Sequence, residues 1–321
     1  KKMKKNKTYF MFSHTIKKQP HNRDLLLKIL RKKIRLIDYE CLKKEGKRIV
    51  AFGKYAGIAG AYNSLMAYGK KFKLFKLRRL SEFKNKKELY LFSKDNPIIK
   101  KVKTLIIGNG RVAKGAVELL NYFGFKNVTI EEYKKGFNKR PVYCILKTRD
   151  YLENISGDRF SKVDYYKYPE KYRSNFLKLK DKTDILLNAS YWDPRYPRIF
   201  EEKDVDNNFS IKVIGDITCD INGSIPLTKF ASTIKKPFFD YCIKSRKVIK
   251  PFSKDKTVTM MTIDNLPSEL PRDSSNYFGK VLMRYLIPFL REKNNDIIKR
   301  ATVAEKGNLT ERFEYLRDYI S

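Results

Sequence analysis

The sharpest change in hydrophobic pattern lies in residues 104–120, where a short apolar run gives way to a helical pattern. The run stops at Gly108, and apolar residues return with helical spacing after Gly110. This order predicts a strand, a tight turn and a helix. In a dinucleotide-binding turn the backbone would turn at Gly108, approach a pyrophosphate at Gly110 and let the helix pack closely on the strand at Gly115. Because the spacing is G-x-G-x-x-x-x-G, the turn alone also fits a strand-to-helix connection without a ligand.

Elsewhere the pattern predicts an α/β protein. Strands are expected at residues 8–13, 34–39, 127–130, 184–189, 211–217 and 257–264, and helices at 25–30, 53–68 and 274–292. The strand–helix–strand order within residues 8–39 is typical of a parallel α/β unit. Residues 70–103 are lysine-rich and irregular, which indicates a linker or a peripheral helix.

Several predicted strands end in residues that suit a nucleotide site. The carboxyl ends of an open parallel sheet line the nucleotide crevice, so residues 188–192 and 216–220 are candidates for cofactor and substrate contacts. Glu131 and Glu132 stand at the end of the strand after the glycines, about 20 residues on, where an acidic residue binds the ribose 2′-hydroxyl of NAD. Basic residues that follow could instead neutralise the 2′-phosphate of NADP, which leaves both cofactors open: Lys134, Lys135 and Arg140.

Composition narrows the class of protein. With 321 residues, 42% of them apolar, the chain is long enough for two domains with proper cores. No apolar run reaches the roughly 18 residues of a membrane span and no secretory leader is recognisable, which predicts a soluble, cytoplasmic protein. The four cysteines lie far apart, and with two histidines they offer no zinc-ligand spacing. We therefore expect reduced, mostly buried thiols and no metal, and the sequence makes no prediction of oligomeric state.

The formal net charge of +36 does not by itself indicate a nucleic-acid partner. The basic residues are spread over nearly every segment and interleaved with Asp and Glu, whereas a nucleic-acid binder concentrates them on one face. Lysine far outnumbers arginine, and lysine is the poorer residue for bidentate recognition of bases or phosphates. The expected behaviour is nonspecific adsorption to polyanions at low salt, not specific nucleic-acid binding.

His14 is the first residue that suggests chemistry outside the glycine turn. It follows the predicted strand at residues 8–13, and the end of such a strand is where α/β proteins usually bind substrate. An imidazole suits proton transfer near neutral pH. A surface histidine in a loop is the alternative interpretation.

Six segments, taken in order along the chain, together resemble one family. They are FSHTIKKQ (12–19), RLIDYE (35–40), KRIVAFGKYAGIAG (47–60), GNGRVAKGA (108–116), GDITCDINGSI (215–225) and TIDNLPSELPRDSSNYFG (262–279). They are similar to lysine-ketoglutarate reductase, the amino-terminal half of aminoadipic semialdehyde synthase, and to the lysine-forming saccharopine dehydrogenases, which are relatives of alanine dehydrogenase. The resemblance implies an α/β fold of two Rossmann-like domains, with parallel sheets flanked by helices and the active site in the cleft between them. The expected division is 1–52 with 226–321 as the catalytic domain, incomplete at its N-terminus, and 53–225 as the dinucleotide-binding domain.

The resemblance also implies roles for individual residues. His14 matches the proton-donating histidine. The implied substrate-binding residues are Gln19, Arg48, Phe52, Ser190, Tyr191 and Trp192. The implied cofactor-binding residues, in addition to Glu131 and Glu132, are Lys47, Gly108, Gly110, Arg111, Gly215, Asp216, Ile217 and Thr218. Lys47 stands where the family has an arginine, which weakens that contact.

The implied activity is an NAD- or NADP-dependent oxidoreductase that interconverts L-lysine plus 2-oxoglutarate and saccharopine by reductive amination. The family places a catalytic lysine ahead of the strand that carries the histidine, and no lysine in KKMKKNK sits in that motif. We therefore expect either a partial chain of a longer enzyme or a chain that lost its first strands. The alternatives are a noncatalytic nucleotide-binding homologue and an alanine dehydrogenase-like amino-acid dehydrogenase.

Overall fold

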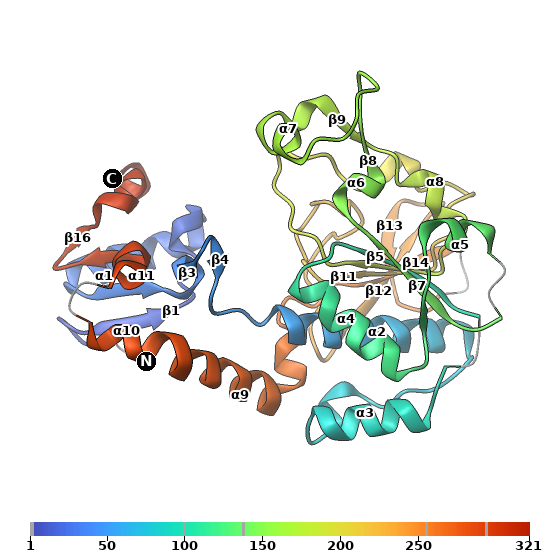
Figure 1. Ribbon diagram of the computed structural model, residues 1–321, viewed down its shortest axis with the longest axis horizontal. Helices are drawn as coiled ribbons and strands as arrows, with labels where there is room; N and C mark the ends of the chain where they lie inside the picture. The colour runs from blue at the N-terminus through green and yellow to red at the C-terminus, as the bar shows by residue number, and fades with distance from the viewer. Residues whose placement is uncertain (1–2, 99–100, 137–138, 254–255, 293–294) are drawn as a thin grey trace. The chain divides into compact units, whose positions relative to one another are not determined.

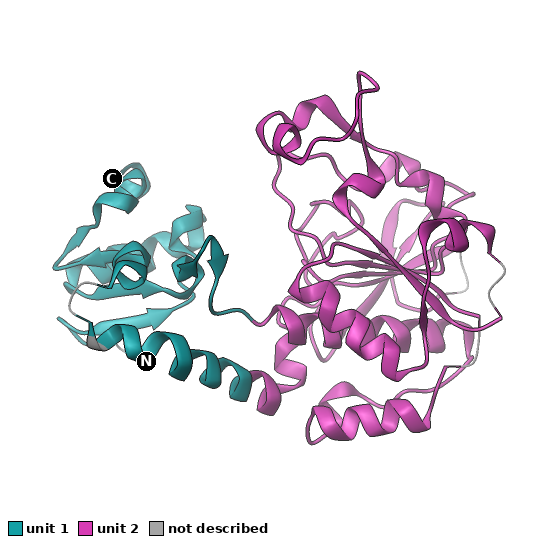
Figure 2. Ribbon diagram, viewed as in Figure 1, with its two compact units in different colours: residues 1–51, 275–321 teal, residues 52–274 magenta. Residues whose placement is uncertain are grey.

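The computed structural model describes residues 3–98, 101–136, 139–253, 256–292 and 295–321. The chain forms two compact units, residues 1–51 with 275–321 (unit 1) and residues 52–274 (unit 2) (Figure 2). The segment 226–274, expected in the catalytic domain, lies in unit 2 instead. The reason is strand pairing, because β14 (Thr257–Met261) lies parallel to β11 (Val213–Asp216) and continues its sheet.

Unit 2 is built on an eight-stranded sheet in the order β13-β12-β14-β11-β10-β5-β7-β6. Its remaining strands are β5 (Lys103–Ile107), β6 (Lys126–Asn127), β7 (Val142–Leu146), β10 (Ile185–Asn188), β12 (Phe238–Cys242) and β13 (Lys247–Ile249). The six strands from β14 to β6 run parallel, and β12 and β13 are antiparallel additions at one edge. The strands at the centre are almost wholly buried, as a parallel sheet covered on both faces requires. The expected α/β class is confirmed.

Helices cover this sheet (Figure 1). The helices of unit 2 are α2 (Gly53–Phe72), α3 (Lys86–Asp95), α4 (Arg111–Tyr122), α5 (Ile130–Lys135), α6 (Thr148–Tyr151), α7 (Lys162–Lys167) and α8 (Leu177–Lys180). Of these, α3 lies outside α2 and α4, and α7 lies beside the small strand pair described next. A small antiparallel pair, β8 (Leu152–Asn154) and β9 (Tyr172–Ser174), stands apart from the main sheet. The lysine-rich stretch at 70–103 contains α3, the peripheral helix that was one of the two expectations.

The closest helix packing in unit 2 is between α2 and α4. A methyl group added at Gly57 would overlap the carbonyl oxygen of Val112, and one at Gly115 would overlap that of Lys54. Gly115 therefore allows close approach, as predicted, but its neighbour is α2 and not the strand β5.

Unit 1 contains a four-stranded sheet in the order β1-β2-β15-β16. The strands are β1 (Thr8–Met11), β2 (Arg35–Asp38), β15 (Thr302–Glu305) and β16 (Asn308–Leu309). β1 and β2 pair in parallel around α1 (Arg23–Arg31), as the strand–helix–strand pattern predicts. β15 and β16 are antiparallel, so this sheet is mixed rather than wholly parallel. The unit also contains a hairpin of β3 (Lys43–Lys44) and β4 (Lys47–Arg48). Its α-helices, besides α1, are α9 (Pro271–Val281), α10 (Ile287–Arg291), α11 (Asp296–Ala301) and α12 (Arg317–Ile320). The first residues of α9 belong to unit 2.

A buried carboxyl group lies between α2 and the short helix η7 (Leu266–Glu269). Glu269 is fully buried, and one of its carboxyl oxygens accepts a hydrogen bond from Asn63 Nδ2 at 2.8 Å. Its Oε2 and Asn63 Oδ1 are buried without a hydrogen-bond partner among the described residues. Burial raises the pKa of Glu269 above its ordinary value of 4.5, although Asn63 and Arg79 act in the opposite direction.

We expect the Glu269→Gln variant to be more stable than the wild type at pH 8 and nearly equal to it near pH 4.5. The raised pKa means that the folded state holds this proton more tightly, so the wild type loses stability as pH rises above 4.5 through the folded pKa. A neutral amide keeps the shape and removes the buried charge. Melting temperatures at both pH values measure the effect, with the exposed Glu170→Gln as the matched control. A Glu269→Gln shift of the same size at both pH values would contradict a raised pKa.

Candidate active site

The candidate catalytic residues of unit 1 meet where β1 and β2 end side by side. Met11 is level with Asp38 in the parallel pair, so the chain segments that follow, with His14 and Glu40, leave the sheet at the same edge. Nδ1 of His14 lies 3.3 Å from Oε2 of Glu40. Arg48 and Lys17 approach the other carboxylate oxygen at 3.2 Å and 3.8 Å. The Glu40 side chain is only 8% exposed whereas that of His14 is 47% exposed, so a buried carboxylate lies beside an imidazole that reaches solvent. Glu40 Oε2 has no hydrogen-bond partner among the described residues, so this contact is a close approach and not a hydrogen bond.

Asp38 fixes the two turns that follow β1 and β2. Its buried carboxylate accepts hydrogen bonds from the backbone N–H and hydroxyl of Ser13 and from the backbone N–H of Glu40 at 2.8 Å. His14 itself adopts a left-handed backbone conformation, with φ of 54°. Such a conformation is unfavourable for a residue with a Cβ and persists where the surroundings impose it, often at functional sites. Neither Asp38 nor Glu40 is marked by the sequence as a functional residue, although both lie in the RLIDYE segment.

The other predicted residues near the start of the chain lie outside this cluster. Gln19 is exposed, and its side-chain oxygen accepts a hydrogen bond from Asn22 Nδ2 at 3.1 Å. Lys47 is exposed on β4. Phe52 precedes α2 and is the first residue of unit 2. Within unit 1, the structure thus brings His14 and Arg48 together and leaves Gln19 and Lys47 apart from them.

The glycine turn of unit 2 has the shape of a pyrophosphate site. Gly108 has φ of 103°, and a Cβ there would lie 2.7 Å from the carbonyl oxygen of Ala189, so only glycine fits. Gly110 has nothing within 4 Å of where its Cβ would stand, which leaves room for a ligand against the backbone. It precedes α4, a helix of 12 residues whose first residue, Arg111, is exposed. Open backbone, a helix N-terminus and a basic side chain together fit a dinucleotide pyrophosphate.

Polar residues at the ends of β10 and β11 form a buried network beside this turn. Asn188 donates to Asp216 and to Thr218, both at 2.9 Å, and accepts from the Ser190 hydroxyl at 2.8 Å. Burial raises the pKa of Asp216, whose carboxylate also accepts from Thr228 at 2.6 Å. Gly215 and Asp216 are buried, and a Cβ on Gly215 would point at Ser64 of α2. We infer that Asp216 positions the loop that follows β11. Thr218 and Ser190 are partly exposed.

The remaining predicted residues of this strand end differ in exposure. Ile217 is buried and lies against Gly60 of α2. Tyr191 is 83% exposed. The Trp192 indole donates to the carbonyl oxygen of Tyr196 at 3.0 Å.

Glu131 and Glu132 do not stand at the end of a strand, and that part of the prediction is wrong. β6 is only two residues long and lies at the edge of the sheet, where it pairs with β7 and not with β5. Both glutamates stand in the first turn of α5, and Glu132 closes a capping box with Thr129. Lys134 and Lys135 are on the same short helix, and exposed Arg140 precedes β7.

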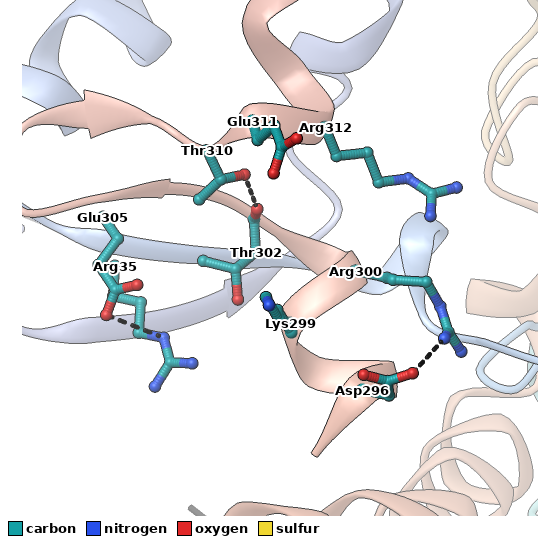
Figure 3. A pocket seen from close by; sticks show the side chains of 9 residues that line it. All are labelled: Arg35, Asp296, Lys299, Arg300, Thr302, Glu305, Thr310, Glu311 and Arg312. Carbon is teal, nitrogen blue, oxygen red and sulfur yellow. Dashed lines mark hydrogen bonds and ion pairs between the residues drawn. The ribbon is translucent and has the colours of Figure 1, made fainter. Parts of the chain in front are cut away.

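A cavity of about 600 Å³ in unit 1 does not coincide with the His14 cluster (Figure 3). The residues that line it are all of polar or charged types: Arg35, Asp296, Lys299, Arg300, Thr302, Glu305, Thr310, Glu311 and Arg312. Arg300 pairs with Asp296 at 3.0 Å and Arg35 with Glu305 at 3.7 Å, so much of its charge is neutralised within the cavity.

Other classes of site find no support in the described part of the chain. No helix there is long and apolar enough to cross a membrane. No group of three or more metal-ligating side chains that could hold an ion occurs among the described residues. All four cysteines are free, and Cys144 and Cys242 are buried while Cys41 and Cys219 are partly so. Burial and nearby carboxylates raise the pKa of Cys41 to about 11, which keeps it a thiol at neutral pH.

The chain is similar to known proteins over nearly its whole length. No family model matches the chain. The alpha-aminoadipic semialdehyde synthase of Arabidopsis thaliana is 30% identical over 97% of this chain, and the mitochondrial enzyme of Mus musculus is 28% identical over 98%. The chain spans 33% and 39% of the length of these two relatives. Because the mouse relative is mitochondrial, the cytoplasmic location expected for this chain stays a prediction.

Two further comparisons cover more of the matched protein. A Schizosaccharomyces pombe protein named "Saccharopine dehydrogenase [NAD(+), L-lysine-forming]" is 25% identical over 92% of this chain and 73% of its own length. An L-alanine dehydrogenase structure superposes with a TM-score of 0.58 at 12% identity, over 99% of this chain and 77% of that one, which shows the fold alone. The chain is therefore a homologue of the alpha-aminoadipic semialdehyde synthases and the lysine-forming saccharopine dehydrogenases, with the fold of L-alanine dehydrogenase.

Proposed function

We propose that this chain is an NAD(P)-dependent oxidoreductase that joins L-lysine and 2-oxoglutarate into saccharopine or catalyses the reverse reaction. The observation that carries the proposal is the cluster of His14, Glu40 and Arg48 at the ends of two parallel strands. The glycine turn of unit 2, which fits a dinucleotide, supplies the second requirement of a hydride transfer. The names of the homologues supply the substrate class.

Reductive amination requires proton transfer at the nitrogen that links the two substrates. When bound, the nicotinamide would supply or accept the hydride. His14 would give or take the proton at the carbinolamine and imine nitrogen. Glu40, 3.3 Å from Nδ1, would hold the ring so that Nε2 faces the substrate.

Arg48 would anchor a substrate carboxylate. Its side chain is 43% exposed and contacts Glu40 through one terminal nitrogen. A guanidinium has five N–H donors in a planar fork, so it can contact Glu40 and a substrate carboxylate together. Both 2-oxoglutarate and saccharopine offer such carboxylates.

The proposal is tested by oxidation of NADH and of NADPH that depends on both L-lysine and 2-oxoglutarate. Saccharopine-dependent reduction of NAD or NADP tests the reverse direction. Turnover with pyruvate and ammonia instead would support an alanine dehydrogenase-like activity. Dinucleotide binding without turnover on any of these substrates would support the noncatalytic homologue.

The Arg48→Ala variant is expected to raise the KM for 2-oxoglutarate or saccharopine about 10- to 100-fold, since a charge-assisted hydrogen bond contributes about 1.5–3 kcal/mol. Arg48→Lys should recover only part of this because an ammonium group lacks the fork. Steady-state kinetics measure the effect. Lys44→Ala, an exposed basic residue on the same hairpin, is the matched control. An unchanged KM in Arg48→Ala would remove Arg48 from the substrate site.

A further inference from the structure

A second cavity, in unit 2, is lined neither by the His14 cluster nor by the glycine turn. Its volume is about 670 Å³, within the range of small-molecule sites. Four segments form it: the end of α2, the chain that follows this helix, the turn before β12 and the loop after β13. Its basic side chains are those of Lys70, Arg79, Lys235 and Lys236.

The charges that line this cavity are all of one sign. No carboxylate lines it among the described residues. The cavity of unit 1 in Figure 3 differs, because three carboxylates stand among its four basic residues. Burial and the neighbouring charges of Arg79 and Lys76 lower the pKa of Lys70. Arg79 also acts on Glu269, but that carboxyl group is fully buried and does not line the cavity. Such a concentration of positive charge favours an anionic ligand.

Hydrogen bonds hold the segments that carry three of these cations. Arg79 Nη2 donates to the carbonyl oxygen of Ile234. Thr233 closes the turn at 233–236, because its backbone N–H donates to the carbonyl oxygen of Lys236 at 3.3 Å and its hydroxyl accepts from the backbone N–H of Lys236 at 3.1 Å. Arg79, Lys235 and Lys236 therefore stand on connected segments, which reduces the ordering that a ligand would impose.

The same cavity offers aromatic surface. The rings of Phe238 and Phe252 pack with their centroids 5.6 Å apart and their planes at 63°. Phe238 is buried, whereas Phe252 is partly exposed and can receive a ligand. Phe252 has φ of 63°, a left-handed conformation that is unfavourable for a bulky side chain and often marks a functional position. An aromatic ring of this kind can stack with any nucleobase.

We propose that this cavity binds a nucleoside polyphosphate at a site separate from the glycine turn. The phosphates would lie against the four basic side chains and the base against Phe252. Three strands, β14, β11 and β10, stand between β12, whose first residue lines the cavity, and β5, which leads into the glycine turn. The ligand would therefore be an additional one that takes no part in hydride transfer, and the proposal does not depend on the proposed function.

The experiment measures binding of ATP, inorganic tripolyphosphate and adenosine to the wild-type protein by isothermal titration calorimetry. A magnesium-free buffer of about 0.15 M salt screens nonspecific adsorption to the basic surface. ATP is expected to bind at least about ten-fold more tightly than either fragment, because only ATP contacts both the cations and the ring. The double variant Lys235→Ala/Lys236→Ala should lose at least about ten-fold in ATP affinity and keep its affinity for dinucleotides. Phe252→Ala should weaken ATP and leave tripolyphosphate unchanged, which also shows that the variant is folded.

The matched control is the double variant Lys244→Ala/Lys247→Ala. It removes the same charge from exposed positions on the hairpin of β12 and β13, outside the cavity, and should bind ATP as the wild type does. An equal loss of ATP affinity in the two double variants would show general attraction by a basic surface and overturn the proposal. Unchanged ATP affinity in Lys235→Ala/Lys236→Ala would place the nucleotide elsewhere, and tripolyphosphate that binds as tightly as ATP would exclude a role for the base. Either result, or a wild-type protein that does not bind ATP, would overturn the proposal and leave the proposed function standing.

Discussion

Replacing His14 with glutamine is expected to lower turnover of lysine and 2-oxoglutarate about 10²- to 10⁴-fold, the usual contribution of a positioned general acid–base group. Glutamine keeps a polar group near Glu40 but does not exchange a proton near neutral pH. The chemical step should therefore slow, while dinucleotide affinity, which we assign to the glycine turn of unit 2, should not change. Steady-state kcat and dinucleotide binding on the same preparation measure the two effects.

The sequence provides its own control for this substitution. His21, the other histidine of the chain, is exposed, and its ring approaches only the neighbouring Asn22 among the hydrogen bonds of the described residues. His21→Gln makes the same chemical change and should retain wild-type turnover. Glu40→Gln should lower kcat, because the neutral amide is a weaker partner than the buried carboxylate for the imidazole 3.3 Å away. Normal turnover in His14→Gln would remove His14 from the mechanism.

The sequence predicts those elements whose signals are local. The strand–turn–helix at β5 and α4 is predicted to within a residue or two, because a buried strand, two turn glycines and a helical pattern follow one another directly. The order of strands in a sheet is set by pairing between distant segments. Counting residues along the chain therefore does not show which strand lies beside β5. Counting about 20 residues from the glycines leads to Glu131 and Glu132. In the sheet β5 lies between β10 and β7, and β7 begins only at Val142. The capping-box pattern Thr129-x-x-Glu132 was a local signal that a helix begins there.

In the candidate site, too, some residues are noticeable in the sequence and others gain a role only through the fold. His14 is noticeable because histidine after a strand is rare and chemically distinctive. Glu40 and Asp38 are not, since acidic residues follow strands on many protein surfaces. Their roles depend on burial and on the parallel pairing that sets β2 beside β1. The sheet of unit 1 shows a further non-local feature, because β15 enters it from about 265 residues along the chain and antiparallel to β2.

Placing alanine at Gly57 is expected to destabilise unit 2 by about 3 kcal/mol or more. The added methyl would overlap the carbonyl oxygen of Val112 and lie 2.9 Å from the backbone nitrogen of Ala116. These are backbone atoms of α4, which no side-chain rotation can move away. Alanine favours helix over glycine by about 1 kcal/mol, and this gain is smaller than the cost of separating two packed helices. Urea unfolding followed by the fluorescence of Trp192, which lies in unit 2, measures the loss.

A control and a double variant make this prediction specific to the helix crossing. Gly279 of unit 1 is also helical, but nothing lies within 4 Å of where its Cβ would stand. Gly279→Ala should therefore be neutral or slightly stabilising when unfolding is followed by circular dichroism, which reports both units. Gly115→Ala meets the same crossing from the other helix, through the backbone of Lys54 and Ile58. One separation of α2 from α4 relieves both overlaps, so the double variant should lose less stability than the sum of the single losses. Additive losses, or a Gly57→Ala variant as stable as the wild type, would show that α2 and α4 do not pack backbone to backbone. Since α4 begins at the glycine turn, a separated crossing should also weaken dinucleotide binding in Gly57→Ala and leave it unchanged in Gly279→Ala.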